Sequence, residues 1–299
     1  MKNKGISLIE LLVSTVIAIL VIDATIMTYT NIKRSYSDIN DEVDKNVKAI
    51  TVQQLFDLAV NNIGYACYRG SIGQTFNDVT GDNISIFNKG PISVGTMPIT
   101  AAFLPSTMEV NCNVSTCYES GSDYLMIQRD RNIGSVGSVN NDDITIVGGT
   151  LINSLQVGDY MATCNSSEYS LLKISSASNG VYQFVDSPDL FSDNQYVGDY
   201  ELSIYFTRAN GLNDADGNPI ISLYAYVQSK SAGASYELVA GVSNLQIKTV
   251  TKASISLGQA INWQAISSDI KLDNTFEAIQ ISYDIAGETF TRMFPLEVY

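Results

Sequence analysis

The chain contains no histidine among its 299 residues. This absence excludes nucleophilic sites of the serine–histidine and cysteine–histidine types, general bases built on histidine, and zinc sites with a histidine ligand. Carboxylate or lysine chemistry remains open, but no spacing among the 31 Asp and Glu residues selects a pair for acid–base work. We therefore expect a protein that is not an enzyme and holds no cofactor.

Basic residues are scarce as well, since 17 Lys and Arg stand against 31 Asp and Glu and give a formal charge of −14. A protein this acidic cannot neutralise a run of phosphates, so we exclude nucleic acid as a partner. Charged residues make up only 16% of the chain, and Gly, Ser, Thr, Asn and Tyr are abundant instead. That mixture is typical of a secreted domain rich in β-strands and turns.

The longest apolar run lies at the N-terminus, where MKNKG precedes the 17 residues Ile6–Ile22 with a single charge at Glu10. As a helix this run spans about 26 Å, close to the thickness of the hydrocarbon core of a membrane. Lys2 and Lys4 precede it, so the positive-inside rule leaves the N-terminus in the cytoplasm. An ordinary secretory signal would need small residues at a cleavage site, and Leu20–Thr30 offers no good one. A plain signal anchor is the other simple interpretation.

Neither interpretation explains Glu10. A carboxylate inside an apolar span is costly in lipid, which implies a cationic partner at the same depth. Cleavage after Gly5 would give Ile6 a free amine one helical turn from Glu10, on the same chain or on a neighbour. We therefore expect removal of the leader 1–5, which leaves 294 of the 299 residues and, with two lysines lost, changes the side-chain charge from −14 to −16.

The stretch GISLIE, with Gly5, Ile6 and Glu10 in order, resembles the class III signal of type IV pilins and pseudopilins. The resemblance implies that prepilin peptidase cleaves after Gly5, that the amine of Ile6 is methylated, and that Glu10 acts in filament assembly. Ile6 departs from the phenylalanine most common at that position.

An amphipathic pattern continues the helix beyond the membrane. Residues at spacings of three and four mark one stripe of a helix, namely Ile32, Tyr36, Ile39, Val43, Val47, Ile50, Gln54 and Leu58. We expect a transmembrane half over 6–30 and an amphipathic half over 31–64 that packs on the rest of the protein and ends near Gly64. A kink near Asp23 or Thr28, which would make the second half a separate soluble helix, stays open.

After Gly64 the apolar period changes to two residues. We expect one β-rich domain over 65–299, mostly antiparallel because the connections are short, and hence an α+β fold. The predicted strands are Asp123–Gln128, Asp143–Val147, Asp159–Cys164, Leu171–Ser175, Val181–Val185, Tyr200–Thr207, Ile220–Gln228, Val242–Val250, Phe276–Asp284 and Glu288–Phe294. Ala286–Gly287 predicts a tight hairpin, 259–270 predicts a short helix, and 69–119 predicts long loops.

The four cysteines, Cys67, Cys112, Cys117 and Cys164, fit two disulfides formed in an oxidising compartment. Four cysteines permit three pairings, and zinc held by four thiolates stays open although no CxxC motif is present. The short loop from Cys112 to Cys117 is the easiest to close. That leaves Cys67 to pair with Cys164, a bridge that would tie the helix end to the sheet and contribute ~3–5 kcal/mol.

One segment has the spacing of a metal loop. NDADGNP at 213–219 places oxygen ligands at Asp214, Asp216 and Asn218, as in the first half of a calcium loop, but the glutamate at the end of such a loop is missing. The segment also lies between two predicted strands, where Asp, Gly, Asn and Pro are ordinary turn residues. We favour a turn, with calcium as the alternative, and expect no other metal site.

Several sequence segments, taken in their order along the chain, resemble those of the PilW-type minor pilins. NNIGYACYRGS provides a glycine–tyrosine–cysteine element after the long helix, VGDYMATC a Gly-Asp strand that ends in cysteine, and YELVAGVSNLQIKTV the late leucine–valine segment. The C-terminus RMFPLEVY lacks the arginine–asparagine ending of that family. The resemblance implies a long helix, the pilin spine, packed on a β-rich domain.

The resemblance also implies where the protein acts and with what. A minor pilin is held in the inner membrane with its C-terminal domain in the periplasm, and then joins a cell-surface pilus, here at the tip. Its partners would be the other minor pilins, the major pilin, prepilin peptidase and the assembly platform of the inner membrane. The alternatives are a J-type pseudopilin of type II secretion, a pilus-tip adhesin and a membrane-anchored enzyme.

Overall fold

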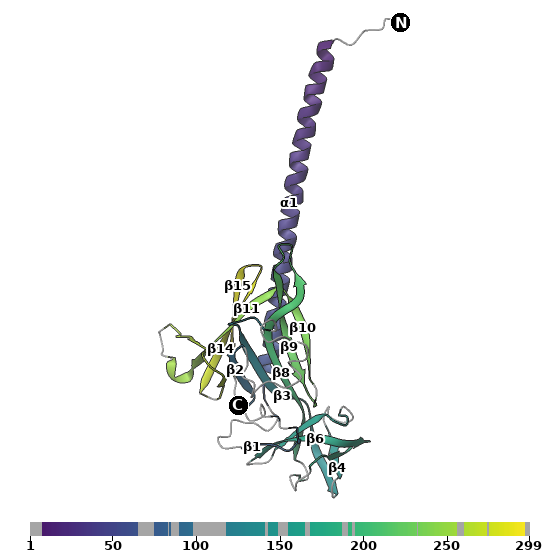
Figure 1. The fold of residues 1–299 in the computed structure, drawn as a ribbon, viewed down its shortest axis with the longest axis vertical. Coiled ribbons are helices and arrows are strands. Elements are labelled where there is room, and N and C mark those ends of the chain that lie inside the picture. Colours follow the sequence, from purple (N-terminus) through teal and green to yellow (C-terminus); the bar gives the residue numbers. More distant parts are fainter. Residues whose placement is uncertain are drawn as a thin grey trace. The chain divides into compact units, whose positions relative to one another are not determined.

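The computed structural model describes residues 8–64, 75–82, 84, 90–97, 118–140, 143–148, 155–164, 168–186, 191–192, 195–231, 233–255, 260–273 and 275–296. One long helix is followed by two β-sheets (Figure 1). This arrangement confirms the α+β class expected from the change of period. The chain divides into two compact units, Met1–Ile50 and Thr51–Tyr299, with a boundary inside the helix.

The helix, α1, runs without interruption over Leu8–Asn61, a length of 54 residues. Neither Gly nor Pro occurs in that span, so nothing in the sequence breaks the backbone hydrogen bonds. At its end the Asn62 side-chain amide donates to the Leu58 carbonyl at 2.7 Å, and Gly64 takes a positive φ of 107°. The two predicted halves therefore belong to one helix.

The larger sheet has 11 strands in the order β10-β9-β8-β5-β6-β7-β4-β3-β2-β13, with β1 pairing to β6. A further pairing of β3 with β8 closes β3, β4, β7, β6, β5 and β8 into a ring. The strands are β1 Thr75–Asp78, β2 Ile92–Thr96, β3 Asp123–Asn140, β4 Asp143–Val147, β5 Tyr160–Cys164, β6 Glu168–Ser178, β7 Val181–Phe184, β8 Tyr196–Asn213, β9 Pro219–Gln228, β10 Ala234–Ala240 and β13 Ile270–Lys271. Pairing is antiparallel throughout this set except between β1 and β6.

The smaller sheet has four strands in the order β12-β11-β14-β15. They are β11 Val242–Thr251, β12 Gln264–Ala265, β14 Phe276–Ile285 and β15 Glu288–Pro295. Ala286 and Gly287 both take positive φ, 50° and 78°, and form the two-residue turn between β14 and β15. This confirms the predicted hairpin.

The last turns of α1 help to form the core of the second unit. Val52, Phe56, Ala59 and Val60 are buried. The Phe56 ring lies 5.8 Å from the Tyr205 ring on β8 and 6.4 Å from the Phe294 ring on β15, measured between centroids. Phe56 therefore contacts both sheets, and this part of the helix joins them.

Three local predictions are wrong. The helix expected over 259–270 is absent from its described part, where β12 pairs with β11 and β13 pairs with β2. The region 69–119 contains two strands, β1 and β2, and β10 was not predicted at all. β1 pairs with β6, β2 with β3 and β13 with β2, and a local apolar pattern carries no information about such distant partners. β10 pairs with β9, the strand that precedes it.

Candidate assembly interface on α1

Five serine and threonine hydroxyls in the N-terminal half of α1 are satisfied within the helix. They donate to backbone carbonyls three or four residues earlier, at 2.7–2.9 Å, and belong to Ser14, Thr15, Thr25, Thr28 and Thr30. Such back-bonding removes the cost of a hydroxyl in lipid. By length and composition, α1 is the one helix in the described part of the chain that could cross a membrane.

Glu10 lies in the first turn of α1 with an exposed side chain. A carboxylate at a helix N-terminus is favoured by the helix dipole. Ile9 and Leu11 beside it are 73% and 59% exposed, so this carboxylate lies on a helix surface that is otherwise apolar. Gly5 and Ile6, the predicted cleavage and methylation residues, lie outside the described residues.

The structure corrects the expected packing of the amphipathic half. The apolar residues predicted to pack on the domain are 54–67% exposed instead, and we call them the exposed stripe: Ile32, Tyr36, Ile39, Val43, Val47, Ile50 and Leu58. Gln54, predicted on the same stripe, is also exposed. Helical spacing puts Val52, Phe56 and Ala59 on a different side of α1, and that side carries the buried contacts.

Charged residues on the other sides of α1 form pairs within the helix. Lys45 contacts Glu42 at 2.6 Å and Lys48 contacts Asp44 at 2.7 Å, between the ammonium nitrogen and a carboxylate oxygen. Hydrogen bonds from Lys45 and Asn46 lower the pKa of Glu42. These exposed pairs support the helix only weakly. An apolar stripe flanked by solvated charges is the pattern of a helix that packs against other helices.

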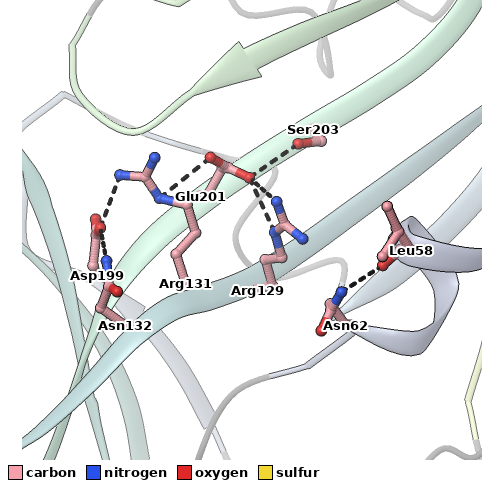
Figure 2. Close-up of polar contacts among 8 residues, drawn as sticks. All are labelled: Leu58, Asn62, Arg129, Arg131, Asn132, Asp199, Glu201 and Ser203. Atoms are coloured by element: carbon pink, nitrogen blue, oxygen red, sulfur yellow. Dashed lines mark hydrogen bonds and ion pairs between the residues drawn. The ribbon is translucent and has the colours of Figure 1, made fainter. Parts of the chain in front are cut away.

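A second cluster of charges lies where β3 pairs with β8 (Figure 2). Glu201 accepts hydrogen bonds from Arg129 at 3.0 and 2.6 Å and forms an ion pair with the Arg131 Nε at 3.3 Å. Asp199 accepts from the Arg131 Nη2 at 2.8 Å and from Asn132 at 3.1 Å. A bulge in β3 between Asp130 and Ile133 brings Arg131 and Asn132 to the same pair of acids.

This cluster is better explained as structural support than as a ligand site. The two carboxylates are buried, and two guanidinium groups balance their charge, so no net charge remains to attract a ligand. Burial raises the pKa of Asp199 even though Arg131 beside it acts in the opposite direction. This cluster is not apparent in the sequence, because Arg129 and Glu201 are 72 positions apart and only strand pairing brings them together.

We expect Glu201→Gln to destabilise the second unit by about 1–3 kcal/mol, because it leaves two arginines with one buried carboxylate between them. The partial exposure of the arginines keeps the effect below that of a fully buried pair. Urea denaturation of the full-length protein in detergent measures the change. Asp44→Asn, which breaks an exposed pair on α1, is the matched control and should change stability by less than about 0.5 kcal/mol. Equal effects of the two variants would contradict a supporting role for the cluster.

The candidate calcium residues lie in the turn between β8 and β9. The Asp214 carboxylate accepts the backbone N–H groups of Asp216 at 2.9 Å and Asn218 at 2.8 Å, and the Asn218 side-chain amide at 3.3 Å. These bonds lower the pKa of Asp214. Gly217 takes a positive φ of 87°. The segment thus uses its carboxylate to hold its own turn, and no group of three or more Cys, Asp or Glu among the described residues could hold a metal ion.

Of the four cysteines, only Cys164 lies within the described residues. It is buried at the end of β5 and is disulfide-bonded. Cys67, Cys112 and Cys117 lie outside the described residues. The pairing of Cys67 with Cys164 and of Cys112 with Cys117 therefore stays a prediction.

Comparison with protein-family models, with curated proteins and with solved structures finds no match to this chain. The residues of α1 and their exposure are therefore the basis for assigning a function.

Proposed function

We propose that this protein is a minor pilin of a type IV pilus, similar to the PilW type, and that it acts in assembly rather than catalysis. The supporting observation is the exposed stripe on α1, which follows an apolar segment long enough to cross a membrane. A stripe of that length, left exposed while another side of the same helix is buried, suits packing into a bundle of parallel spines.

In this proposal each part of the chain has one task. The apolar half of the helix over 6–30 holds the protein in the inner membrane until assembly, and prepilin peptidase removes the leader 1–5 by cleavage after Gly5. Glu10 then pairs with the amine of an Ile6, which offsets the cost of a carboxylate in lipid. The exposed stripe packs against the spines of other pilins, and the acidic β-rich domain makes subunit contacts at the filament end.

A J-type pseudopilin of a type II secretion system would have the same kind of spine, so the exposed stripe supports both assignments. The two differ in the filament that contains the protein. A minor pilin is recovered with surface pili, whereas a pseudopilin stays in the periplasm and depends on the secretion genes. The order of the sequence segments that resemble PilW-type minor pilins favours the minor pilin.

The test is recovery of this chain in pili sheared from the producing cells, followed by intact-mass measurement. We expect a mature chain of 294 residues that begins at Ile6 and carries one methyl group on its amine. A fraction sheared from cells without the assembly platform is the control and should lack the protein. A mature chain that begins near residue 25 would show an ordinary signal peptide, and absence from the sheared fraction would refute the minor-pilin assignment.

A further inference from the structure

The two sheets of the described chain end in five strands, and four of these are poor templates for a further strand. Strands β12 and β13 have two residues each, and β1 has four. Strand β10 has a register shift between Glu237 and Val239, which interrupts its outer edge. Short strands and bulges are common means by which proteins prevent edge-to-edge pairing. The fifth strand, β15, has neither feature.

β15 is a regular edge of eight residues that pairs only with β14, without a register shift. In a two-residue hairpin the residues that flank the turn exchange both hydrogen bonds, and every second pair beyond them does the same. Thr289, Thr291 and Met293 lie between those pairs, so their backbone N–H and C=O groups point away from β14. The described part of the chain provides no partner for these backbone groups.

The side chains of β15 define which strand could pair with this edge. Phe290, Arg292 and Phe294 alternate along the side of β15 that faces the core. Phe294 is buried, and its ring centroid lies 6.4 Å from that of Phe56 on α1. Arg292 is exposed, although its partner across the ladder is the buried Ile281. A charge at this position opposes pairing with a purely apolar strand and favours a strand that brings a carboxylate.

We infer that β15 pairs with a strand from another pilin of the same filament, and that this strand has an acidic residue between two apolar residues at alternate positions. The acidic residue lies beside Arg292, and the apolar residues lie beside its two phenylalanine neighbours. The outward backbone groups of β15 form the ladder of hydrogen bonds to that strand. The inference rests on the proposed function, because that function supplies the neighbouring pilin.

The position of β15 in the fold favours a neighbouring pilin as the partner. Through the contact of Phe294 with Phe56, the edge lies beside the last turns of α1, the helix that packs on other spines in the proposed filament. A subunit whose spine packs there brings its own domain to this edge. A place at the filament end favours a different subunit over a second copy, because a minor pilin contributes few copies to that end.

Photocrosslinking in sheared pili identifies the partner. Benzoylphenylalanine replaces Met293, whose side chain is 57% exposed on the open edge. In the control it replaces Tyr236, which is also 57% exposed but lies on β10, the interrupted edge of the larger sheet. We expect a crosslink from position 293 to a different pilin and little crosslinking from position 236. The crosslinked peptide should have the expected pattern of an acidic residue between two apolar ones.

Thr291→Pro tests the ladder itself. The Thr291 N–H points away from β14, so proline removes a donor from the open edge and leaves the pairing with β14 intact. The variant should be depleted from sheared pili at least about tenfold, because it loses a hydrogen bond to the partner strand and its ring obstructs that strand. Thr291→Val is the matched control and should incorporate normally. Both variants lose the hydrogen bond from the Thr291 hydroxyl to Ser282 at 3.1 Å, but valine keeps the backbone N–H.

Arg292→Glu tests the charge without a change in the backbone, so it decides the question even if the proline variant does not fold. It should be depleted from sheared pili about three- to tenfold, because it replaces an attraction to the partner strand by a repulsion. Arg292→Lys keeps the charge and should incorporate nearly normally.

The outcomes separate this inference from the proposed function. If the unsubstituted chain is present in pili but folded Thr291→Pro or Arg292→Glu incorporates normally, the strand pairing is refuted and the minor-pilin assignment stands. Crosslinks from position 293 only to a second copy, or to a protein that is not a pilin, refute the pairing in the same way. Absence of the unsubstituted chain from pili refutes both.

Discussion

A Glu10→Val variant is expected to be inserted, cleaved and stable, but at least about tenfold depleted from sheared pili. The reason is the depth of the carboxylate. The variant loses the ion pair between the Glu10 carboxylate and a cation, and water cannot screen such a pair in lipid. Loss of the pair should lower the equilibrium constant for incorporation into the filament more than about tenfold. Immunoblots of sheared filaments beside whole cells measure the ratio.

The matched control is Ser14→Val, one turn further along α1. The Ser14 hydroxyl donates to the Leu11 carbonyl of its own helix at 2.9 Å. Replacing Ser14 by valine therefore removes a hydrogen bond within the helix and no contact between chains. Incorporation of this variant should stay near normal. Normal incorporation of Glu10→Val would mean that the glutamate has no role in assembly or that the chain works outside the filament.

The elements that the sequence predicts well are those fixed by local pattern. Apolar residues at helical spacing, without Gly or Pro, predict α1 almost to its observed end at Asn61. Alternation predicts β4 at its observed bounds, Asp143–Val147. The positive φ values of Ala286 and Gly287 match the hairpin expected there. In each case the residues that decide the structure lie within a few positions of one another.

The partner of each apolar surface could not be predicted in the same way. α1 has two apolar sides in its last turns, one with Phe56 and one with Leu58. The stripe predicted from periodicity is the one with Leu58, and periodicity does not state which side the domain covers. The charge cluster has the same origin, because Arg129 and Glu201 meet only after β3 and β8 pair. The candidate interface is thus visible in sequence as a stripe, but its exposure is a property of the fold.

The second large effect concerns the buried side of α1. Phe56→Ala is expected to lower the free energy of unfolding of the second unit by about 3–5 kcal/mol. The Phe56 side chain has no exposed surface and contacts Tyr205 on one sheet and Phe294 on the other. Truncation of this side chain leaves a cavity between α1, β8 and β15, and these three elements cannot move together to fill it. For a unit of this size the midpoint of thermal unfolding should fall by about 6–20 °C.

Leu58→Ala separates stability from assembly on the same stretch of helix. Leu58 lies two residues from Phe56 but is 62% exposed, so its truncation should change the free energy of unfolding by less than about 0.5 kcal/mol. Thermal melts of the full-length protein in detergent, followed by circular dichroism of the β-strands, compare the two variants. Because Leu58 belongs to the exposed stripe, its variant should instead incorporate less well into pili. A large loss of stability from Leu58→Ala, or none from Phe56→Ala, would mean that the two sides of α1 have been assigned the wrong way round.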